Sequence, residues 1–270
     1  MKNMETSHPQ GNILDKIVAK KWQEIENDKA GISVRSLEES AFFPRECFSM
    51  RDFILNPALT GIIAEYKRKS PSKGIINDRN SVEEVTNGYV KAGASALSVL
   101  TDESFFGGHK HDLVAARKAN NIPVLRKDFM LDEFQIIEAK SLGADIILLI
   151  AAILSPKEVH SLAKCAKSLG LNVLLEVHNL EELKRSLCDE LDAVGVNNRN
   201  LGNFSVSVQH SYDLAEYIPS QFLKISESGI SDPSTIRDLK AAGFDGFLIG
   251  ENFMKETDPG QAMKDFVAKI

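Results

Sequence analysis

One structural unit recurs along the chain from residue 61 onward: a short apolar segment, a polar turn, an amphipathic stretch and then a glycine. Eight such apolar segments are present, each four to six residues long and rich in Ile, Val and Leu. This composition is typical of strands buried on both faces of a parallel sheet. Their starts lie 21 to 34 residues apart, which leaves room for one crossover helix between successive strands. The predicted strands are 61–65, 95–100, 123–126, 145–150, 172–176, 193–196, 222–226 and 245–249.

This alternation predicts an α/β fold, a (β/α)8 TIM barrel whose strands close on themselves. An open eight-stranded sheet is the alternative. Four predicted helices begin with a capping residue three positions before Glu or Gln, the pattern of a capping box. These pairs are Ser81 and Glu84, Asp132 and Gln135, Ser155 and Glu158, and Asn179 and Glu182. Glycines in the left-handed conformation are expected to end the helices at Gly93, Gly143, Gly170 and Gly243.

Residues 1–60 stand outside the repeat and carry an apolar stripe at helical spacing. The stripe consists of Ile13, Leu14, Ile17, Val18, Trp22 and Ile25. We therefore expect one domain over 1–270, with an N-terminal helical extension (1–60) packed on the barrel (61–270). Two interpretations of the helix are open: a lid over one barrel end, which the sequence favours, or a contribution to the substrate-binding mouth.

Composition excludes several classes of function. A net charge of −6 gives no reason to expect nucleic acid or an anionic membrane as a partner. The polar amino terminus does not resemble a signal peptide, and no apolar run approaches the ~20 residues of a transmembrane helix. Three cysteines without a CxxC pair indicate a reducing compartment, so a cytoplasmic location is expected.

Charged and amide side chains follow the predicted strands, at the barrel end where catalytic residues of this fold lie. Glu176 directly follows apolar residues and would be a costly buried carboxylate unless paired. Burial would lower the pKa of Lys127 and neighbouring carboxylates would raise it, and the sequence leaves the balance open. The set that we expect to converge includes Glu65, Lys67, Lys127, Glu176, Asn197, Arg199 and Glu227.

Three segments have the composition of a phosphate-binding loop. SESGI at 226–230 and IGEN at 249–252 follow the seventh and eighth strands, where this fold commonly binds phosphate through backbone N–H groups. SPSKG at 70–74 adds hydroxyls, a lysine and a glycine after the first strand. We therefore predict a phosphorylated small-molecule substrate.

These motifs together resemble one family. IAEYKRKSPSKG at 63–74 is similar to the signature of indole-3-glycerol phosphate synthases, and five further blocks match in order: LRKDF at 125–129, LLEV at 174–177, GVNNRNL at 195–201, SESGI at 226–230 and LIG at 248–250. The resemblance runs from about residue 10 to the end of the chain. It implies a carboxy-lyase of tryptophan biosynthesis that closes the ring of 1-(2-carboxyphenylamino)-1-deoxyribulose 5-phosphate, with loss of CO2 and water.

The resemblance also implies a role for each residue. Lys127 is the first general acid, Lys67 holds the substrate carboxylate and is a candidate acid for dehydration, and Glu65 and Glu176 are the candidate bases. Asn197 and Ser228 orient hydroxyl groups, with Glu227 and Arg199 as polar supports. Ser70, Gly229 and Gly250 hold the phosphate, with Lys69 nearby. Phe106, Phe129 and Leu201 form a wall for the aromatic ring. Weak association with other enzymes of the pathway is expected.

Several other residues are not included in the expected catalytic set. Glu251 follows the phosphate-loop glycine, and we expect its side chain to point away from the phosphate. His109 and His111 are interpreted as a solvated helix start, and His178 as either a neighbour of Glu176 or a surface residue. We expect no metal site, and the lack of a GxGxxG, Walker or flavin motif predicts no organic cofactor.

Two rival functions remain. Phosphoribosylanthranilate isomerase is a related phosphate-binding barrel that uses a Cys and an Asp, but no cysteine here ends a predicted strand. A catalytically silent scaffold barrel would show gaps among the residues at the strand ends, and none is found.

Overall fold

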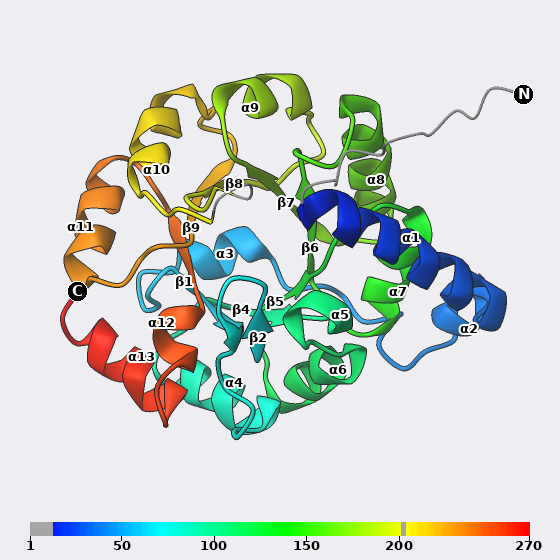
Figure 1. The fold of residues 1–270 in the computed structure, drawn as a ribbon, viewed down its shortest axis with the longest axis horizontal. Coiled ribbons are helices and arrows are strands. Elements are labelled where there is room, and N and C mark those ends of the chain that lie inside the picture. The colour runs from blue at the N-terminus through cyan, green and yellow to red at the C-terminus, as the bar shows by residue number, and fades with distance from the viewer. Residues whose placement is uncertain (1–12, 201–203) are drawn as a thin grey trace, which may run out of the picture.

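The computed structural model describes residues 13–200 and 204–270, and eight of its strands form a closed parallel barrel. The strand order is β1-β10-β9-β8-β7-β6-β5-β4, and pairing of β1 with β4 closes the ring (Figure 1). The predicted TIM barrel is therefore confirmed, and the open sheet is wrong. The barrel strands are β1 (Ile62–Tyr66), β4 (Ala96–Leu100), β5 (Val124–Lys127), β6 (Ile146–Ile150), β7 (Asn172–Val177), β8 (Ala193–Asn197), β9 (Leu223–Glu227) and β10 (Gly246–Ile249).

Each observed strand starts and ends within one residue of its predicted segment, because the apolar runs are buried on both faces as expected. One pair of short strands was not predicted. The loop after β1 contains a small antiparallel hairpin, β2 (Lys69–Ser70) with β3 (Gly74–Ile75).

Helices surround the barrel on the outside (Figure 1). They are α4 (Val82–Lys91), α6 (Lys110–Ala119), α7 (Glu133–Ser141), α8 (Pro156–Ser168), α9 (Leu180–Ser186), α10 (Gln209–Leu214), α11 (Pro233–Ala241) and α13 (Pro259–Val267). Shorter turns are α5 (Glu103–Phe106), η1 (Ala215–Tyr217) and α12 (Glu251–Met254). None of the helices in the described part of the chain is long and apolar enough to cross a membrane.

Local capping follows the sequence with one exception. The capping boxes at Ser81, Asp132 and Ser155 are present. Asn179 caps α9, but Glu182 accepts from the backbone N–H of His178 rather than from that of Asn179, so the reciprocal half of the fourth box is missing. The four predicted terminal glycines all have positive φ.

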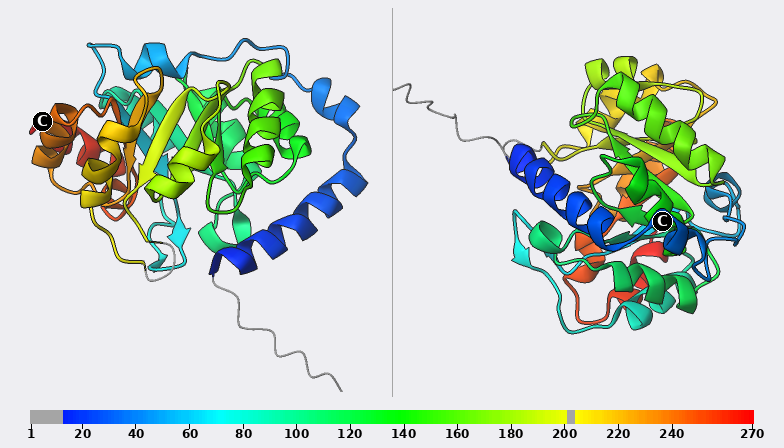
Figure 2. Two further views of the ribbon diagram at one scale, coloured as in Figure 1. Left: turned by 90° about the horizontal axis from the view of Figure 1, so that it is seen from above. Right: turned by 90° about the vertical axis from the view of Figure 1, so that its right-hand side faces the viewer.

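The N-terminal segment covers both ends of the barrel. Helix α1 (Ile13–Gly31) lies on the side where the strands end, and α2 (Val34–Glu38) leads along the side to α3 (Met50–Ile54) at the opposite end (Figure 2). The predicted stripe is wrong at Trp22, whose side chain is exposed. Ile17, Lys21 and Ile25 form the buried face instead, and Trp22 is rotated about 100° away from it.

Apolar side chains fill the barrel interior, as expected for this fold. Met50 and Ile54 of α3 close the end from which the strands start, and Ile17 of α1 joins the same apolar cluster. The strand residues in this cluster include Ile63, Ala96, Leu125, Ile146, Leu148, Leu174, Ala193, Ile225 and Leu248. Among the described residues, side chains thus fill the barrel interior below the strand ends, and the barrel is open at the end where the strands end.

Candidate active site

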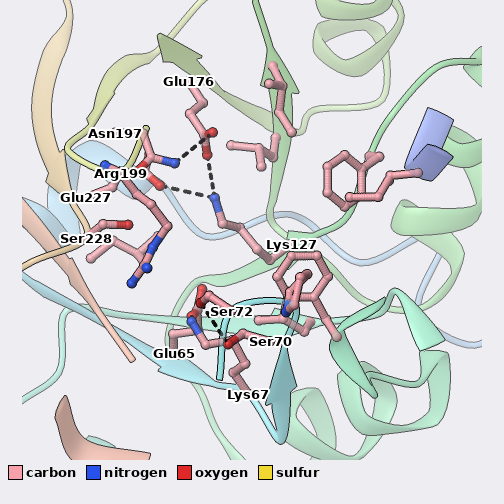
Figure 3. A pocket seen from close by; sticks show the side chains of 18 of the residues that line it. Glu65, Lys67, Ser70, Ser72, Lys127, Glu176, Asn197, Arg199, Glu227 and Ser228 are labelled. Atoms are coloured by element: carbon pink, nitrogen blue, oxygen red, sulfur yellow. Dashed lines mark hydrogen bonds and ion pairs between the residues drawn. The ribbon is translucent and has the colours of Figure 1, made fainter. Parts of the chain in front are cut away.

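A cavity opens at the ends of the strands, and it brings together most of the predicted site residues (Figure 3). Its polar lining comes from the ends of β1, β5, β7, β8 and β9 and from the loops that follow. The predicted site residues in this lining are Glu65, Lys67, Ser70, Lys127, Glu176, Asn197, Arg199, Glu227 and Ser228. We call this cavity the mouth.

Lys127, at the end of β5, lies between two carboxylates. Its ammonium is 2.7 Å from Glu176 Oε2 on β7 and 3.1 Å from Glu227 Oε2 on β9 (Figure 3). Both carboxyl side chains are almost fully buried. One ammonium therefore pairs with two carboxyl groups in the protein interior, where an unpaired charge is costly.

The charges of this trio settle the balance that the sequence left open. Burial alone would lower the pKa of Lys127, but Glu176, Glu227 and Glu65 raise it, so the ammonium stays protonated. Burial would likewise raise the pKa of Glu176, but Lys127 and His178 lower it to about 2. Burial raises the pKa of Glu227, and with Lys127 opposing and Glu176 adding to the rise it reaches about 7. The pKa of Glu176 is therefore lowered and that of Glu227 raised, although both contact the same ammonium.

The absence of a side chain at Gly195 makes room for the Glu227 carboxyl group. A Cβ on Gly195 of β8 would lie 2.0 Å from Glu227 Oε1, so a larger residue there would force the carboxyl group to shift. That Oε1 atom has no hydrogen-bond partner among the described residues. Gly250, on the other side of the mouth, is similarly close to a carboxylate: a Cβ on it would lie 2.6 Å from Glu65 Oε1.

Glu65 and Lys67 form the second charged pair of the mouth. The Lys67 ammonium lies 2.6 Å from Glu65 Oε1, and the Ser98 hydroxyl donates to Oε2 at 3.5 Å. Residues 65 and 67 were expected to share one face, and both line the mouth.

Asn197 and Ser228 also belong to the polar lining. Asn197 Nδ2 donates to Glu176 Oε1 at 3.0 Å, and its Oδ1 accepts from the backbone N–H of Arg199. Ser228 adopts a positive φ of 69°, which is uncommon for a residue other than glycine, and lies next to Gly229 with φ 76°. This turn directs the SESGI loop toward the mouth.

One wall of the mouth is apolar. The rings of Phe106 and Phe129 lie 5.9 Å apart, and Ile13, Leu14 and Ile17 of α1 line the same cavity. The favoured interpretation of the N-terminal helix as a lid alone is therefore wrong, because α1 supplies part of the mouth. Leu201, the third predicted wall residue, lies outside the described residues. Phe204 lines the cavity and was not singled out from the sequence.

A second, more open cavity adjoins the mouth on the side of β9 and β10. It is lined by both predicted phosphate loops, including Ser228, Gly229, Gly250 and Asn252, and by Lys73 and Arg199. Ser70 lies in the mouth, 3.5 Å from the hydroxyl of Ser72. The Lys69 ammonium instead contacts the carbonyl of Ser104 at 3.4 Å, and Lys69 lines neither cavity.

Glu251 corrects an expectation. Its side chain was expected to point away from the phosphate loops, yet it lines both cavities. Arg199 Nη2 lies 3.4 Å from one carboxylate oxygen, and the Lys73 ammonium lies 3.8 Å from the other. The two cations draw the carboxylate inward, across the space between the loops.

The histidines fall into two groups. His178 packs beside Glu176, with Nε2 3.5 Å from Oε1, and Glu182 helps to raise the pKa of its ring although burial opposes this. It is therefore a neighbour of the site and not a surface residue. His109 accepts from the backbone N–H of His111 and caps α6, as expected. A group that could hold a metal ion, His160, Cys188 and Glu190, lies on α8 and the loop after α9, and none of the three lines either cavity.

A parallel barrel with ionisable side chains and glycine-containing loops gathered at its strand ends is the arrangement found in (β/α)8 enzymes. The sequence profile described as indole-3-glycerol phosphate synthase matches residues 14–266. The chain belongs to the indole-3-glycerol phosphate synthase family, a family of decarboxylating lyases of tryptophan biosynthesis, as the sequence motifs predicted.

Similar proteins agree with this assignment. The chain is 46% identical to indole-3-glycerol phosphate synthase of Bacteroides thetaiotaomicron, over 96% of this chain and 99% of the relative. It is 40% identical to that of Polynucleobacter asymbioticus, over 95% and 99%. A crystal structure of 3-hexulose-6-phosphate synthase superimposes with a TM-score of 0.61 at 15% identity, covering 78% of this chain and all of that one, which shows a shared fold only.

Proposed function

We propose that the mouth closes the indole ring of 1-(2-carboxyphenylamino)-1-deoxyribulose 5-phosphate, and that Lys127 is the acid for ring closure. The observation that carries this proposal is the position of the Lys127 ammonium, held between Glu176 and Glu227 at 2.7 and 3.1 Å. Attack of the aromatic carbon on the ketone leaves negative charge on the carbonyl oxygen, which must be protonated as the bond forms. An ammonium that is protonated in the resting site stabilises that oxygen and donates its proton as the carbon–carbon bond forms.

Loss of the proton from Lys127 changes its neighbours. Glu176 is held at a low pKa largely by the ammonium, so its basicity rises once that charge is gone. Glu176 therefore becomes an effective base for the later proton removal only after the first step. Glu227, with a pKa of about 7 and an oxygen 3.1 Å from Lys127, is placed to return a proton to the amine. This gives Glu227 a larger role than the polar support expected from the sequence.

The remaining steps use the other side of the mouth. Lys67 binds the substrate carboxylate, which then departs as CO2 beside the apolar wall formed by Phe106 and Phe129. The hydroxyl leaves as water, and the Lys67 ammonium, in contact with Glu65 at 2.6 Å, is the acid that protonates it. Asn197 and Ser228 orient the sugar hydroxyls.

The substrate phosphate occupies the second cavity. Its anchors are the backbone N–H groups around Gly229 and Gly250, together with Ser70 at the edge of the mouth. Lys69 is a weaker candidate, because its ammonium contacts Ser104 instead.

The organisation and location of the protein are also proposals. Residues 1–60 and 61–270 form one folding unit, which is supported by the packing of α1 and α3 on opposite ends of the barrel. A cytoplasmic location is supported by three free cysteines. Neither nucleic acid nor a membrane is proposed as a partner, and weak association with other enzymes of the pathway remains a prediction.

The function is tested by incubating the purified protein with the substrate and following the fluorescence of the indole product. Lys127→Met should bind the substrate yet lose turnover by at least about a hundredfold, the usual contribution of a general acid. Unchanged turnover in this variant would remove Lys127 from its role.

A further inference from the structure

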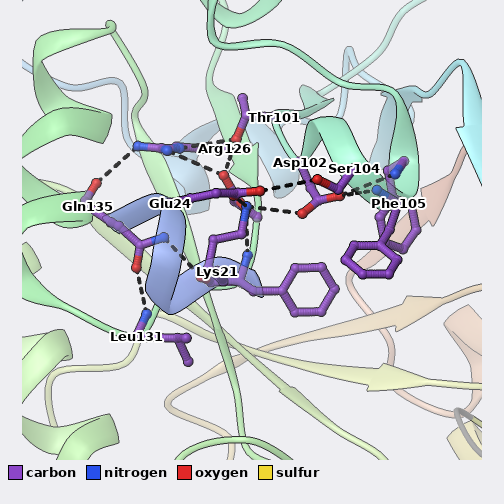
Figure 4. A network of polar contacts seen from close by, with 12 residues as sticks. Lys21, Glu24, Thr101, Asp102, Ser104, Phe105, Arg126, Leu131 and Gln135 are labelled. Carbon is purple, nitrogen blue, oxygen red and sulfur yellow. Dashed lines mark hydrogen bonds and ion pairs between the residues drawn. The ribbon is translucent and has the colours of Figure 1, made fainter. Parts of the chain in front are cut away.

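A second charged cluster adjoins the mouth through Asp128, which belongs to both, and its centre is Lys21 of α1 (Figure 4). The Lys21 ammonium contacts three carboxylates, Glu24 at 2.6 Å, Asp102 at 3.0 Å and Asp128 at 3.0 Å. The side chain is almost fully buried, although a lysine on an otherwise apolar helix face would be expected in water. These contacts connect the N-terminal extension to residues that follow β4 and β5.

Asp102 holds one part of the aromatic wall. Its Oδ1 accepts from the backbone N–H groups of Phe105 and Phe106, at 2.8 and 3.2 Å, and so fixes the short helix α5. Its Oδ2 makes no hydrogen bond within the described residues, and the Lys21 ammonium is the charge beside it. The position of Phe106 therefore depends on Asp102, and the charge of Asp102 is compensated by Lys21 of α1.

Asp128 holds the other part. It follows Lys127 in the chain, and its Oδ1 accepts from the backbone N–H of Phe129 at 2.9 Å. Its Oδ2 accepts from the Thr101 hydroxyl at 2.6 Å and from Arg126 at 3.3 Å. Because Asp128 lies between the acid Lys127 and the wall residue Phe129, its position sets the position of both.

We propose that Lys21 is a positioning residue for the reaction: by compensating Asp102 and Asp128 it fixes Phe106 and the Lys127–Phe129 segment in the geometry that ring closure needs. This proposal rests on the proposed function. Without the ammonium, the buried carboxylates of Asp102 and Asp128 lose the cation that they share. Arg126 still contacts Asp128, so the charge of Asp102 is the less compensated of the two, and its repulsion of Asp128 shifts both segments. A displacement of about 1 Å at such a site is enough to lower turnover about a hundredfold.

The test compares Lys21→Met with Lys29→Met. Lys29 also ties α1 to the barrel, through Asp132 at 2.6 Å, but this ion pair is half-exposed and does not reach the mouth. We expect Lys21→Met to lower kcat about ten- to a hundredfold, with inorganic phosphate still inhibiting at the wild-type concentration, because the phosphate cavity lies at β9 and β10. Lys29→Met should keep the wild-type kcat.

A double variant separates positioning from simple loss of folding. In Lys21→Met/Asp102→Asn the amide still caps α5, but the uncompensated charge is gone, so most of the lost kcat should return. Wild-type kcat in Lys21→Met, an equal loss in Lys29→Met, or no recovery in the double variant would each overturn the proposal. Failure of the proposed function is distinguishable, because the wild-type protein would then be inactive.

Discussion

Glu176 and Glu227 bind the same ammonium, yet their carboxyl groups are driven in opposite directions: the pKa of Glu176 falls to about 2 and that of Glu227 rises to about 7. Both side chains are buried, so burial alone cannot distinguish them. Glu176 has the shorter contact with Lys127 and also accepts from Asn197, whereas one oxygen of Glu227 has no hydrogen-bond partner among the described residues. This difference is what the proposed roles require, a base for Glu176 and a proton carrier for Glu227.

Glu227→Gln should change the pH dependence of stability. A folded-state pKa of about 7, above the ordinary 4.5, means that the folded protein keeps a proton that the unfolded chain releases. The contribution of this group to stability is therefore present below pH 4.5 and is lost as the pH rises through 7. We therefore expect the unfolding free energy of the wild type to fall, relative to that of the variant, by about 1–3 kcal/mol between pH 5 and pH 8. Denaturant titration of both proteins at the two pH values measures this, and parallel curves would contradict it.

Glu251→Gln should tighten phosphate binding. The carboxylate lies between the phosphate loops and occupies Arg199 and Lys73, so removing its charge ends the repulsion and releases two cations. We expect inorganic phosphate to inhibit at concentrations about three- to tenfold lower, with the gain shrinking at high salt. Glu256→Gln, an exposed neighbour, changes the net charge equally and serves as the control. Equal or weaker inhibition in Glu251→Gln would show that the carboxylate does not oppose phosphate.

Gly195→Ala should displace Glu227 and lower kcat. The new Cβ would lie 2.0 Å from Glu227 Oε1, so the carboxyl group must shift and its contact with Lys127 is disturbed. We expect kcat to fall at least about tenfold and stability to fall by about 1–3 kcal/mol, as for other overpacked interiors. Gly31→Ala is the matched control, because its Cβ meets nothing within 4 Å. Wild-type kinetics in Gly195→Ala would mean that the position of Glu227 is unimportant.

Much of this architecture follows from local patterns in the sequence. Strands buried on both faces give short apolar runs, and a helix cap needs only a side chain three residues from its partner, so both were predicted. The hairpin of β2 and β3 was missed because two-residue strands carry no periodic signal. At Asn179 the expected capping box failed because Glu182 is engaged by His178.

The remaining features depend on contacts between distant parts of the chain. The orientation of Glu251 depends on Arg199, which comes from a different loop. The raised pKa of Glu227 depends on Glu176 across the barrel. The role of α1 was hidden because Lys21 interrupts its apolar face, and the partners that allow its burial, Asp102 and Asp128, lie at the ends of two other elements.

The central claim is that this mouth performs a decarboxylating ring closure, and one incubation tests it most directly. Folded protein, dialysed against a chelator, is supplied with the carboxyphenylamino substrate while indole fluorescence and released CO2 are recorded together. We predict that both products appear in equal amounts and that Lys127→Met yields neither. Folded wild-type protein that leaves the substrate unchanged, or that converts it without releasing CO2, would contradict the account.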